Sequence, residues 1–266
     1  MKHARVIYEN QIWSATEAPK GVRLSDGRVL AETDVQWLPP CEFGTIFALG
    51  LNYADHAKEI AFNQAPQAPL VFLKGINALT GHRRFTRRPA DVSYMHYECE
   101  LAVIIGQTCR NVPSEHAYEV VRGYTVANDY AIRDYLENFY RPNLRVKSRD
   151  ACTPIGPWMV DAVDIPDPMN LRFRTWVNGT LTQDGSSREM VHDIPSLIAY
   201  LSSIMTLNPG DLILTGTPEG VVDCQVGDEI VTEVEGVGSL VNTIGGDELL
   251  GQWEGMSPAY GRRGDH

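Results

Sequence analysis

The 266-residue sequence predicts a β-rich α+β fold. Strand-like segments outnumber helical ones and do not alternate with them, which argues against the doubly wound parallel sheet of Rossmann-type proteins. The 16 prolines and 23 glycines indicate many turns between short strands. A hydrophobic content of 43% is that of an ordinary globular protein.

The chain is predicted to divide into a small N-terminal β module, a larger domain and a short tail. Strand-like pieces fill residues 4–10, 11–15 and 21–30, and the breaker Leu38-Pro39-Pro40 ends this run. We therefore expect the β module to span residues 1–40 and the larger domain to span residues 41–256. Residues 257–266 are rich in Gly and Arg and are predicted to form a disordered tail.

The larger domain is expected to contain many short strands and a few helices. Its strands are predicted at residues 45–49, 69–74, 97–105, 123–129, 155–160, 171–177, 212–215 and 229–234. Its helices are predicted at residues 53–60, 114–122, 130–139 and 194–205, with caps from Asn52 and Ser114 on the first two. Residues 62–69 are predicted to form a mobile loop and 75–94 an irregular segment, while Asn178-Gly179 predicts a type I′ hairpin turn.

Composition limits the choice of partners and compartment. The formal net charge of −11 argues against nucleic acid or an anionic membrane, because phosphate groups attract basic surfaces. The five cysteines show neither a C-x-x-C pair nor a zinc spacing, and an odd number without a secretory signal fits a reducing cytoplasm. No apolar run approaches the roughly 20 residues that span a bilayer. The sequence thus predicts a cytoplasmic protein that binds neither nucleic acid nor membrane.

Three acidic residues, Glu98, Glu100 and Asp129, form the strongest candidate site. Residues two apart in a strand project to the same face, so Glu98 and Glu100 are neighbours. The opposite face is almost wholly apolar and must be buried (Tyr97, Cys99, Leu101, Val103 and Ile105). Adjacent carboxylates repel each other unless a proton or a cation lies between them, and hard divalent metals prefer oxygen ligands. The alternative is an exposed edge strand whose glutamates face water.

His56 and Glu59 form a candidate acid–base pair. Their H-x-x-E spacing puts both side chains on one face of the predicted helix. A carboxylate beside an imidazole orients it as a general base requires, although a surface ion pair has the same pattern.

Cations and a Gly-containing turn are candidate substrate contacts. Arg133 follows Asp129 by about one turn of the predicted helix, and alternation puts Lys147 on one side with its basic neighbours at 145 and 149. Such groups are either solvated cations or contacts for a multiply charged anionic substrate. The turn at residues 215–218, which includes Thr217, either grips a carboxylate or simply ends a strand.

Six segments in order resemble the fumarylacetoacetate hydrolase superfamily: GLNYADHAKE, PLVFLK, MHYECELAVIIG, GYTVANDYAIRDY, VKSRD and ILTGTPEGV. They lie within residues 45–245. The stretch from Asn128 to Trp158 is similar to one branch, the bifunctional isomerase/decarboxylases of 4-hydroxyphenylacetate (homoprotocatechuate) degradation.

The resemblance implies a mixed β-roll fold and a site that depends on Mg²⁺ or Mn²⁺. It implies metal ligands at Glu98, Glu100 and Asp129, catalytic residues at His56, Glu59 and Lys147, and substrate contacts at Arg133, Lys74 and Thr217. A homodimer, or pairing with a second subunit of the same family, is expected. In some organisms the bifunctional protein carries two such domains, whereas this chain has room for one.

The implied reaction is decarboxylation of 5-oxopent-3-ene-1,2,5-tricarboxylate to 2-hydroxyhepta-2,4-diene-1,7-dioate, followed by isomerisation to the 2-oxo-3-ene form. Two alternatives remain open. One is hydrolysis of a carbon–carbon bond in an acylpyruvate, with His56 and Glu59 activating water. The other is a metal-dependent binding protein without catalytic activity.

Overall fold

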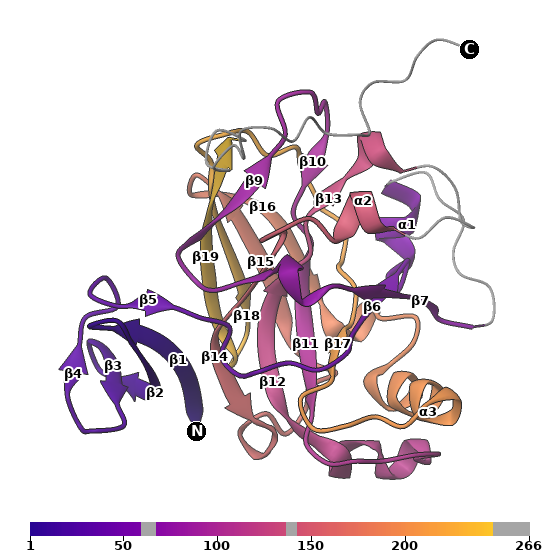
Figure 1. The fold of residues 1–266 in the computed structure, drawn as a ribbon. Coiled ribbons are helices and arrows are strands. Elements are labelled where there is room, and N and C mark those ends of the chain that lie inside the picture. Colours follow the sequence, from indigo (N-terminus) through magenta and orange to yellow (C-terminus); the bar gives the residue numbers. More distant parts are fainter. Residues whose placement is uncertain (60–67, 137–142, 247–266) are drawn as a thin grey trace, which may run out of the picture.

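The computed structural model describes residues 1–59, 68–136 and 143–246, which fold into three β-sheets with short helices at their edges (Figure 1). The largest sheet comprises β1 (Lys2–Tyr8), β2 (Gln11–Ala18), β3 (Gly21–Leu24), β4 (Val29–Leu30), β5 (Gln36–Trp37), β6 (Ile46–Gly50), β7 (Leu70–Lys74), β8 (Leu79–Thr80), β11 (Cys99–Ile105), β12 (Val121–Asn128), β14 (Thr153–Asp161) and β17 (Leu212–Leu214). Its main path runs β4-β3-β2-β1-β14-β12-β11-β17-β6-β7.

Two smaller sheets complete the β structure. The five-stranded sheet comprises β9 (Arg84–Arg88), β15 (Arg172–Val177), β16 (Thr180–Ser186), β18 (Glu229–Val234) and β19 (Gly238–Gly246). The third sheet pairs β10 (Met95–His96) with β13 (Ala131–Ile132). The helices are α1 (Ala54–Glu59), α2 (Leu144–Lys147) and α3 (Ile194–Ile204), with 3₁₀ turns η1 (Ile76–Ala78), η2 (Ser114–Val120), η3 (Arg133–Tyr135), η4 (Ala162–Asp164) and η5 (Ser187–Glu189). The predicted β-rich α+β class is confirmed.

Strand β11 lies inside the large sheet, between β12 and β17, and is buried on both faces. One face packs into a core with β15, β18, β19 and α3 (Cys99, Leu101, Val103 and Ile105). The other face contributes Ala102 and Ile104 to a second core with β6, β14 and β17. The carboxylates of Glu98 and Glu100 lie on this second face, so the alternative of a solvent-exposed edge strand is wrong.

Helix α3 and the hairpin between β15 and β16 follow the sequence pattern. The Asp193 side chain accepts a hydrogen bond from the Ser196 amide at 2.8 Å and caps the first turn of α3. The helix buries Leu197, Ile198 and Leu201, but its last predicted apolar positions, 204 and 205, are exposed. Asn178 and Gly179 have φ of 50° and 79°, as a type I′ turn requires.

Two predicted helices are replaced by other structure. Residues 131–132 pair with β10 instead of forming the helix expected at 130–139, because strand pairing at the sheet outweighs local helix propensity. The next residues form the 3₁₀ turn η3 in place of the predicted helix, and residues 137–139 lie outside the described part. The helix expected at 114–122 is the 3₁₀ turn η2, which begins after Pro113 without a side-chain cap, and its last two residues belong to β12.

Other local predictions also need correction. The Asn52 side chain donates to the His192 and Thr215 carbonyls at 3.0 and 2.8 Å, so it links two segments instead of capping α1. The segment 75–94, predicted to be irregular, contains β8 and β9. Residues 144–147 are helical, so Lys147 points inward while Arg145 and Arg149 lie over the Tyr135 ring.

The N-terminal strands β1 to β5 stand to one side of the remaining structure (Figure 1) and join it through pairing of β1 with β14. The boundary at residue 40 stays a prediction. Most of the predicted loop 62–69, the end of the predicted domain and the predicted tail 257–266 lie outside the described residues. Within residues 1–59, 68–136 and 143–246, no helix has the length and apolarity needed to cross a bilayer.

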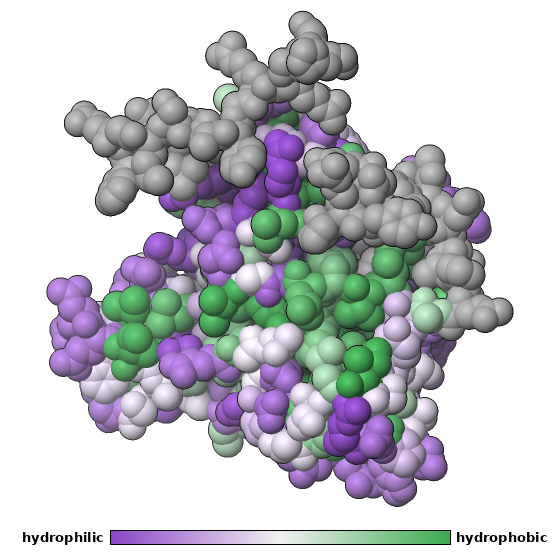
Figure 2. All heavy atoms as spheres, turned by 45° about the vertical axis from the view of Figure 1, so that its right-hand side comes forward, coloured by the Kyte–Doolittle hydropathy of each residue, from purple (hydrophilic) through white to green (hydrophobic). Residues whose placement is uncertain are grey.

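One face of the molecule collects hydrophobic side chains. Figure 2, turned towards the side where α1 and β7 lie in Figure 1, shows them gathered across the centre of the view. Strand β7 is the last strand at this edge of the large sheet, and Leu73 is 61% exposed on it. Ile76 and Leu144 are also exposed, each at 67%.

Candidate active site

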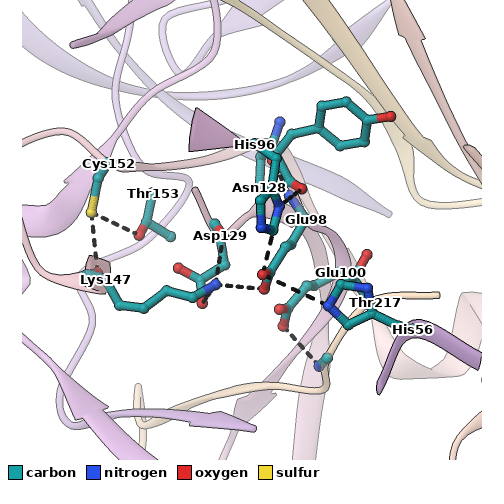
Figure 3. A network of polar contacts seen from close by, with 12 residues as sticks. His56, His96, Glu98, Glu100, Asn128, Asp129, Lys147, Cys152, Thr153 and Thr217 are labelled. Carbon is teal, nitrogen blue, oxygen red and sulfur yellow. Dashed lines mark hydrogen bonds and ion pairs between the residues drawn. The ribbon is translucent and has the colours of Figure 1, made fainter. Parts of the chain in front are cut away.

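The antiparallel pair β11 and β12 positions the three carboxylates. Its register pairs Cys99 with Asn128, and the Asp129 amide donates to the Glu98 carbonyl at 2.9 Å, which sets Glu98 opposite Asp129. Glu100 lies two residues along the same strand and therefore on the same face. Ligand oxygens of the three residues lie within 4.8 Å of one another. Figure 3 shows the three side chains converging.

The carboxylates are almost completely removed from water. Glu98, Glu100 and Asp129 are 6%, 0% and 1% exposed. Glu100 Oε2 accepts a hydrogen bond from the Gly216 amide at 2.8 Å, whereas its Oε1 is buried without a hydrogen-bond partner among the described residues. A buried carboxylate oxygen left without a partner is costly, which points to a ligand at this position.

Three cations from separate elements surround the carboxylates. Lys147 Nζ lies 2.5 Å from Glu98 Oε2 and 3.2 Å from Asp129 Oδ2. Lys74, at the end of β7, places Nζ 2.6 Å from Asp129 Oδ1 and also donates to the Lys147 carbonyl. Arg133 Nη2 lies 3.1 Å from Glu98 Oε1. Lys74 therefore contacts a carboxylate of the cluster, although the resemblance implies a role in binding substrate.

The pKa values of the two glutamates shift in opposite directions. Burial, and then the negative charges of Asp129 and Glu98, raise the pKa of Glu100 well above its usual range. Burial also acts to raise the pKa of Glu98, but Lys147 and Arg133 outweigh it and hold that pKa below its ordinary value. Burial opposes the charged form of Lys147, yet Asp129 and Glu98 raise its pKa. These shifts favour the charged forms of Glu98 and Lys147 and the protonated form of Glu100, whose proton a bound cation would replace.

Helix α1 brings the predicted acid–base pair to the carboxylates. His56 Nδ1 lies 3.0 Å from Glu59 Oε2, and His56 Nε2 lies 3.9 Å from Glu98 Oε1. Glu59 Oε1 accepts a hydrogen bond from the Gly220 amide at 3.0 Å. His56 is 4% exposed, so the pair is not the solvated surface pair considered as the alternative.

The turn at residues 215–218 contacts the protein's own carboxylate. Thr215 Oγ1 donates to the Leu101 carbonyl at 2.8 Å, and the Gly216 amide binds Glu100. Thr217 Oγ1 accepts a hydrogen bond from Gln183 Nε2 at 2.9 Å and is buried. The turn is therefore more than a plain strand end, and Thr217 follows directly on the residue that holds Glu100.

His96 belongs to the site and was missed in the sequence. Arg133 Nε donates to His96 Nε2 at 2.8 Å, and His96 Nδ1 lies 2.9 Å from the Tyr97 carbonyl, which together fix a neutral ring as the acceptor for Arg133. Burial lowers the pKa of His96 to about 3. Residues two apart in a strand share a face, so the pattern that groups Glu98 with Glu100 also includes position 96 and would have identified His96 as a site residue.

The donor set fits a hard divalent cation. Three carboxylates with no thiolate or imidazole ligand favour Mg²⁺ or Mn²⁺ over zinc or copper. The unpartnered Glu100 oxygen and the raised pKa of its carboxyl are what a cation would relieve. The residues present therefore fit such an ion.

The sequence of this chain matches a family of known proteins. Residues 45–245 match the family described as fumarylacetoacetate (FAA) hydrolase C-terminal. The 4-hydroxyphenylacetate degradation bifunctional isomerase/decarboxylase of Salmonella dublin is 56% identical over 231 residues, which are 85% of this chain and 53% of that protein. This chain spans about half the length of the curated bifunctional relatives it matches.

Solved structures share the fold of this chain. The 5-carboxymethyl-2-hydroxymuconate delta-isomerase from Mycobacterium smegmatis has 36% identity and a TM-score of 0.81, over 93% of this chain and 99% of that one. A maleylpyruvate hydrolase from a Sphingobium species, solved with manganese(II) and pyruvate, has 29% identity and a TM-score of 0.78, over 92% and 99% of the two chains. The sequence match, the shared fold and the buried carboxylates together show that this chain belongs to the fumarylacetoacetate hydrolase family of enzymes.

Proposed function

We propose that this chain is a divalent-metal-dependent decarboxylase and isomerase of aromatic catabolism. Its substrate is 5-oxopent-3-ene-1,2,5-tricarboxylate, and its products are 2-hydroxyhepta-2,4-diene-1,7-dioate and the 2-oxo-3-ene isomer. The buried carboxylate triad with its unpartnered Glu100 oxygen carries this proposal. The names of the bifunctional relatives and of the isomerase with the same fold support the reaction class.

The charges of the site favour a polyanionic substrate. The three carboxylates are matched by three cations, Lys74, Lys147 and Arg133. A divalent ion held by the carboxylates would leave the site with two formal positive charges, which attract a substrate that carries three carboxylates. When bound, Mg²⁺ or Mn²⁺ supplies a Lewis acid that polarises a ketone oxygen.

Decarboxylation breaks the carbon–carbon bond to the carboxylate on carbon 2 of the substrate. CO₂ leaves, and the bonding electron pair moves through the conjugated double bond to the ketone oxygen, whose protonation gives the 2-hydroxydiene. Lys147 Nζ and the Arg133 guanidinium orient the substrate carboxylates and offset their charge. Burial of the site excludes water from the developing negative charge.

Isomerisation moves one proton, and His56 is placed to carry it. Its Nδ1 is held by Glu59, which leaves Nε2 directed towards the carboxylate cluster. Nε2 takes the proton from the 2-hydroxyl group, and a proton is delivered to the far carbon of the diene, which yields the 2-oxo-3-ene product.

The test is turnover of the tricarboxylate by metal-stripped protein before and after Mg²⁺ or Mn²⁺ is restored. CO₂ release and ultraviolet absorbance of the dienol report the two steps. We expect activity only with metal, loss of activity in Glu100→Gln, and unchanged activity in Glu229→Gln, whose exposed side chain lies on β18. If the metal-loaded protein releases no CO₂ from the tricarboxylate, the proposed reaction is wrong.

Hydrolysis of an acylpyruvate is the second candidate. The His56–Glu59 pair could equally activate water, and the maleylpyruvate hydrolase has the same fold. Product analysis separates the two functions, because hydrolysis yields two acids and no CO₂. A binding protein without activity would turn over neither substrate.

A homodimer, or pairing with a second subunit of the family, is part of the proposal. Leu73 on β7, which among the described residues is the last strand at this edge of the large sheet, and Ile76 just after it are exposed. Exposed apolar edge strands readily pair with another chain, which supports this part of the proposal. Light scattering of Leu73→Glu should then show a smaller mass than that of the unmodified protein. An unchanged mass would place the contact elsewhere.

A further inference from the structure

A cleft of about 460 Å³ lies away from the carboxylate cluster, where the N-terminal strands meet β14. It is lined by residues of β1, β2 and β3, by segment 40–42, and by Arg122 of β12 and Met159 of β14. None of the carboxylates, cations or histidines of the candidate active site contributes to it. Its volume is in the range of small-molecule sites.

The register of three strands puts polar side chains together on the wall of this cleft. His3 pairs with Thr16, and Thr16 pairs with Arg23, so these three form a row across β1, β2 and β3. Arg5 pairs with Ser14 in the next row on the same face. The intervening residues, such as Ala4 and Ala15, turn towards the core.

Positive charge dominates the lining, although the chain as a whole carries a formal charge of −11. Arg5 lies 3.1 Å from Glu42, the one acidic residue of the lining, but Glu42 is 87% exposed and the pair is therefore weak. Arg23 donates only to the Gly27 carbonyl at 3.4 Å, among the partners that the described residues offer. The Arg122 side chain has neither an ion pair nor a hydrogen bond within the described part of the chain.

Cys41 lines the cleft, and its thiol lies within the electrostatic influence of two of the arginines. Burial raises the pKa of Cys41 to about 11, while the positive charges of Arg122 and Arg5 act in the opposite direction. Both guanidinium groups therefore act on the same wall from different strands. Arg5 has only the exposed Glu42, and His3 Nε2 lies 3.0 Å from Asp161, but Arg23 and Arg122 have no carboxylate partner among the described residues. Converging guanidinium groups of this kind are typical of an anion site.

We propose that this cleft binds a small dianion through carboxylate or phosphate oxygens. Arg23 and Arg122 supply planar donor pairs that match either group, and the hydroxyls of Ser14 and Thr16 supply neutral donors. The site is separate from the candidate active site and does not rest on the proposed function. The ligand would bridge the N-terminal strands to β12 and β14, and so stabilise the junction between them.

Calorimetric titration of the full-length, Mg²⁺-loaded protein tests this proposal. Succinate and inorganic phosphate are the probes, and sodium chloride at equal ionic strength is the reference. We expect saturable binding of at least one probe, weakened roughly tenfold or more by Arg122→Gln and by Arg23→Gln, because each removes charged hydrogen bonds. Both side chains are exposed, so neither change threatens the fold.

Two control variants assign the site. Arg110→Gln removes another exposed arginine that does not line the cleft, and it should leave binding unchanged. Glu100→Gln disables the carboxylate cluster, and cleft binding should persist in it. Binding of succinate alone identifies a dicarboxylate ligand, and binding of phosphate alone a phosphate ligand. The proposal is overturned if no probe saturates, if Arg110→Gln weakens binding as much as the cleft variants do, or if binding disappears in Glu100→Gln.

Discussion

Replacing Glu100 by Gln should stabilise the metal-free protein, although it removes a carboxylate of the site. Ligand oxygens of Glu98, Glu100 and Asp129 lie within 4.8 Å of one another. At an effective dielectric constant of about 20, Coulomb's law gives a repulsion of at least about 3.5 kcal/mol for each charged pair. Burial, and then the part of this repulsion that Lys147 does not offset, raise the pKa of Glu100.

The sign and size of the effect follow from proton linkage. A carboxyl whose folded-state pKa is raised contributes its full stability below its unfolded pKa and loses it as the pH rises towards the folded pKa. The loss is about 1.36 kcal/mol for each pH unit between the unfolded pKa and the folded pKa. Gln does not titrate, so the Tm of Glu100→Gln should rise above that of the unmodified protein as the pH increases, by roughly 2 to 4 °C for each kcal/mol.

Glu98→Gln should have the opposite effect. Glu98 is paired with Lys147 and Arg133, so its loss removes one partner from each of these two cations and costs about 3–5 kcal/mol. Thermal and urea unfolding in EDTA at pH 5, 6 and 7 compare the two variants, with the exposed Glu229→Gln as control. An advantage of Glu100→Gln that does not grow with pH, or a Glu98→Gln variant as stable as Glu100→Gln, would refute this account of the charges.

Four further predictions follow from single contacts. Mn²⁺ or Mg²⁺ at about 100 times its Kd should raise the unfolding free energy by about 2.7 kcal/mol, more strongly at higher pH and not in Glu100→Gln, as thermal shift assays can check. Burial lowers the pKa of His82 to about 3, so this group should lower the unfolding free energy by about 1.36 kcal/mol per pH unit as the pH falls from 6.5 to 3. Urea unfolding across this pH range should show a smaller slope for His82→Asn. Gly216→Ala places a Cβ at φ +90° and 3.0 Å from the Asn52 Cβ, so it should cost about 1–3 kcal/mol in urea unfolding and lower kcat; unchanged activity would show that the amide contact to Glu100 is dispensable. Ile198→Ala in α3 should lower the unfolding free energy by about 2–5 kcal/mol, because Ile198 is fully buried. The kcat of the folded variant should not change, because Ile198 is not a residue of the candidate active site.

The parts of the site that depend on alternation within a strand could be predicted from the sequence. Glu98 and Glu100 share a face because residues two apart in a strand always do, and their separation from Cys99 and Leu101 is confirmed by the two cores. His56 and Glu59 are in contact because three-residue spacing suits a helix of any length.

The features of the site that could not be predicted from the sequence depend on strand pairing between distant segments. The predicted helix at 130–139 failed because β10 supplies hydrogen-bond partners that local propensity does not contain, and Arg133 reaches Glu98 from a 3₁₀ turn instead. Lys74 and Asp129 are far apart in sequence, so their ion pair could not be predicted from spacing. The buried position of Glu100 required β17 beside β11, which only the assembled sheet provides.

The Glu59 carboxylate divides its two oxygens between His56 and the Gly220 amide. The orientation of the His56 ring therefore depends on the position of the loop after β17, although Gly220 contributes only a backbone amide. A substitution that displaced the Gly220 backbone would release Glu59 and let the His56 ring rotate. Under the proposed function, such a change would uncouple proton transfer from decarboxylation: CO₂ would still be lost, but the dienol would leave before it is converted to the ketone.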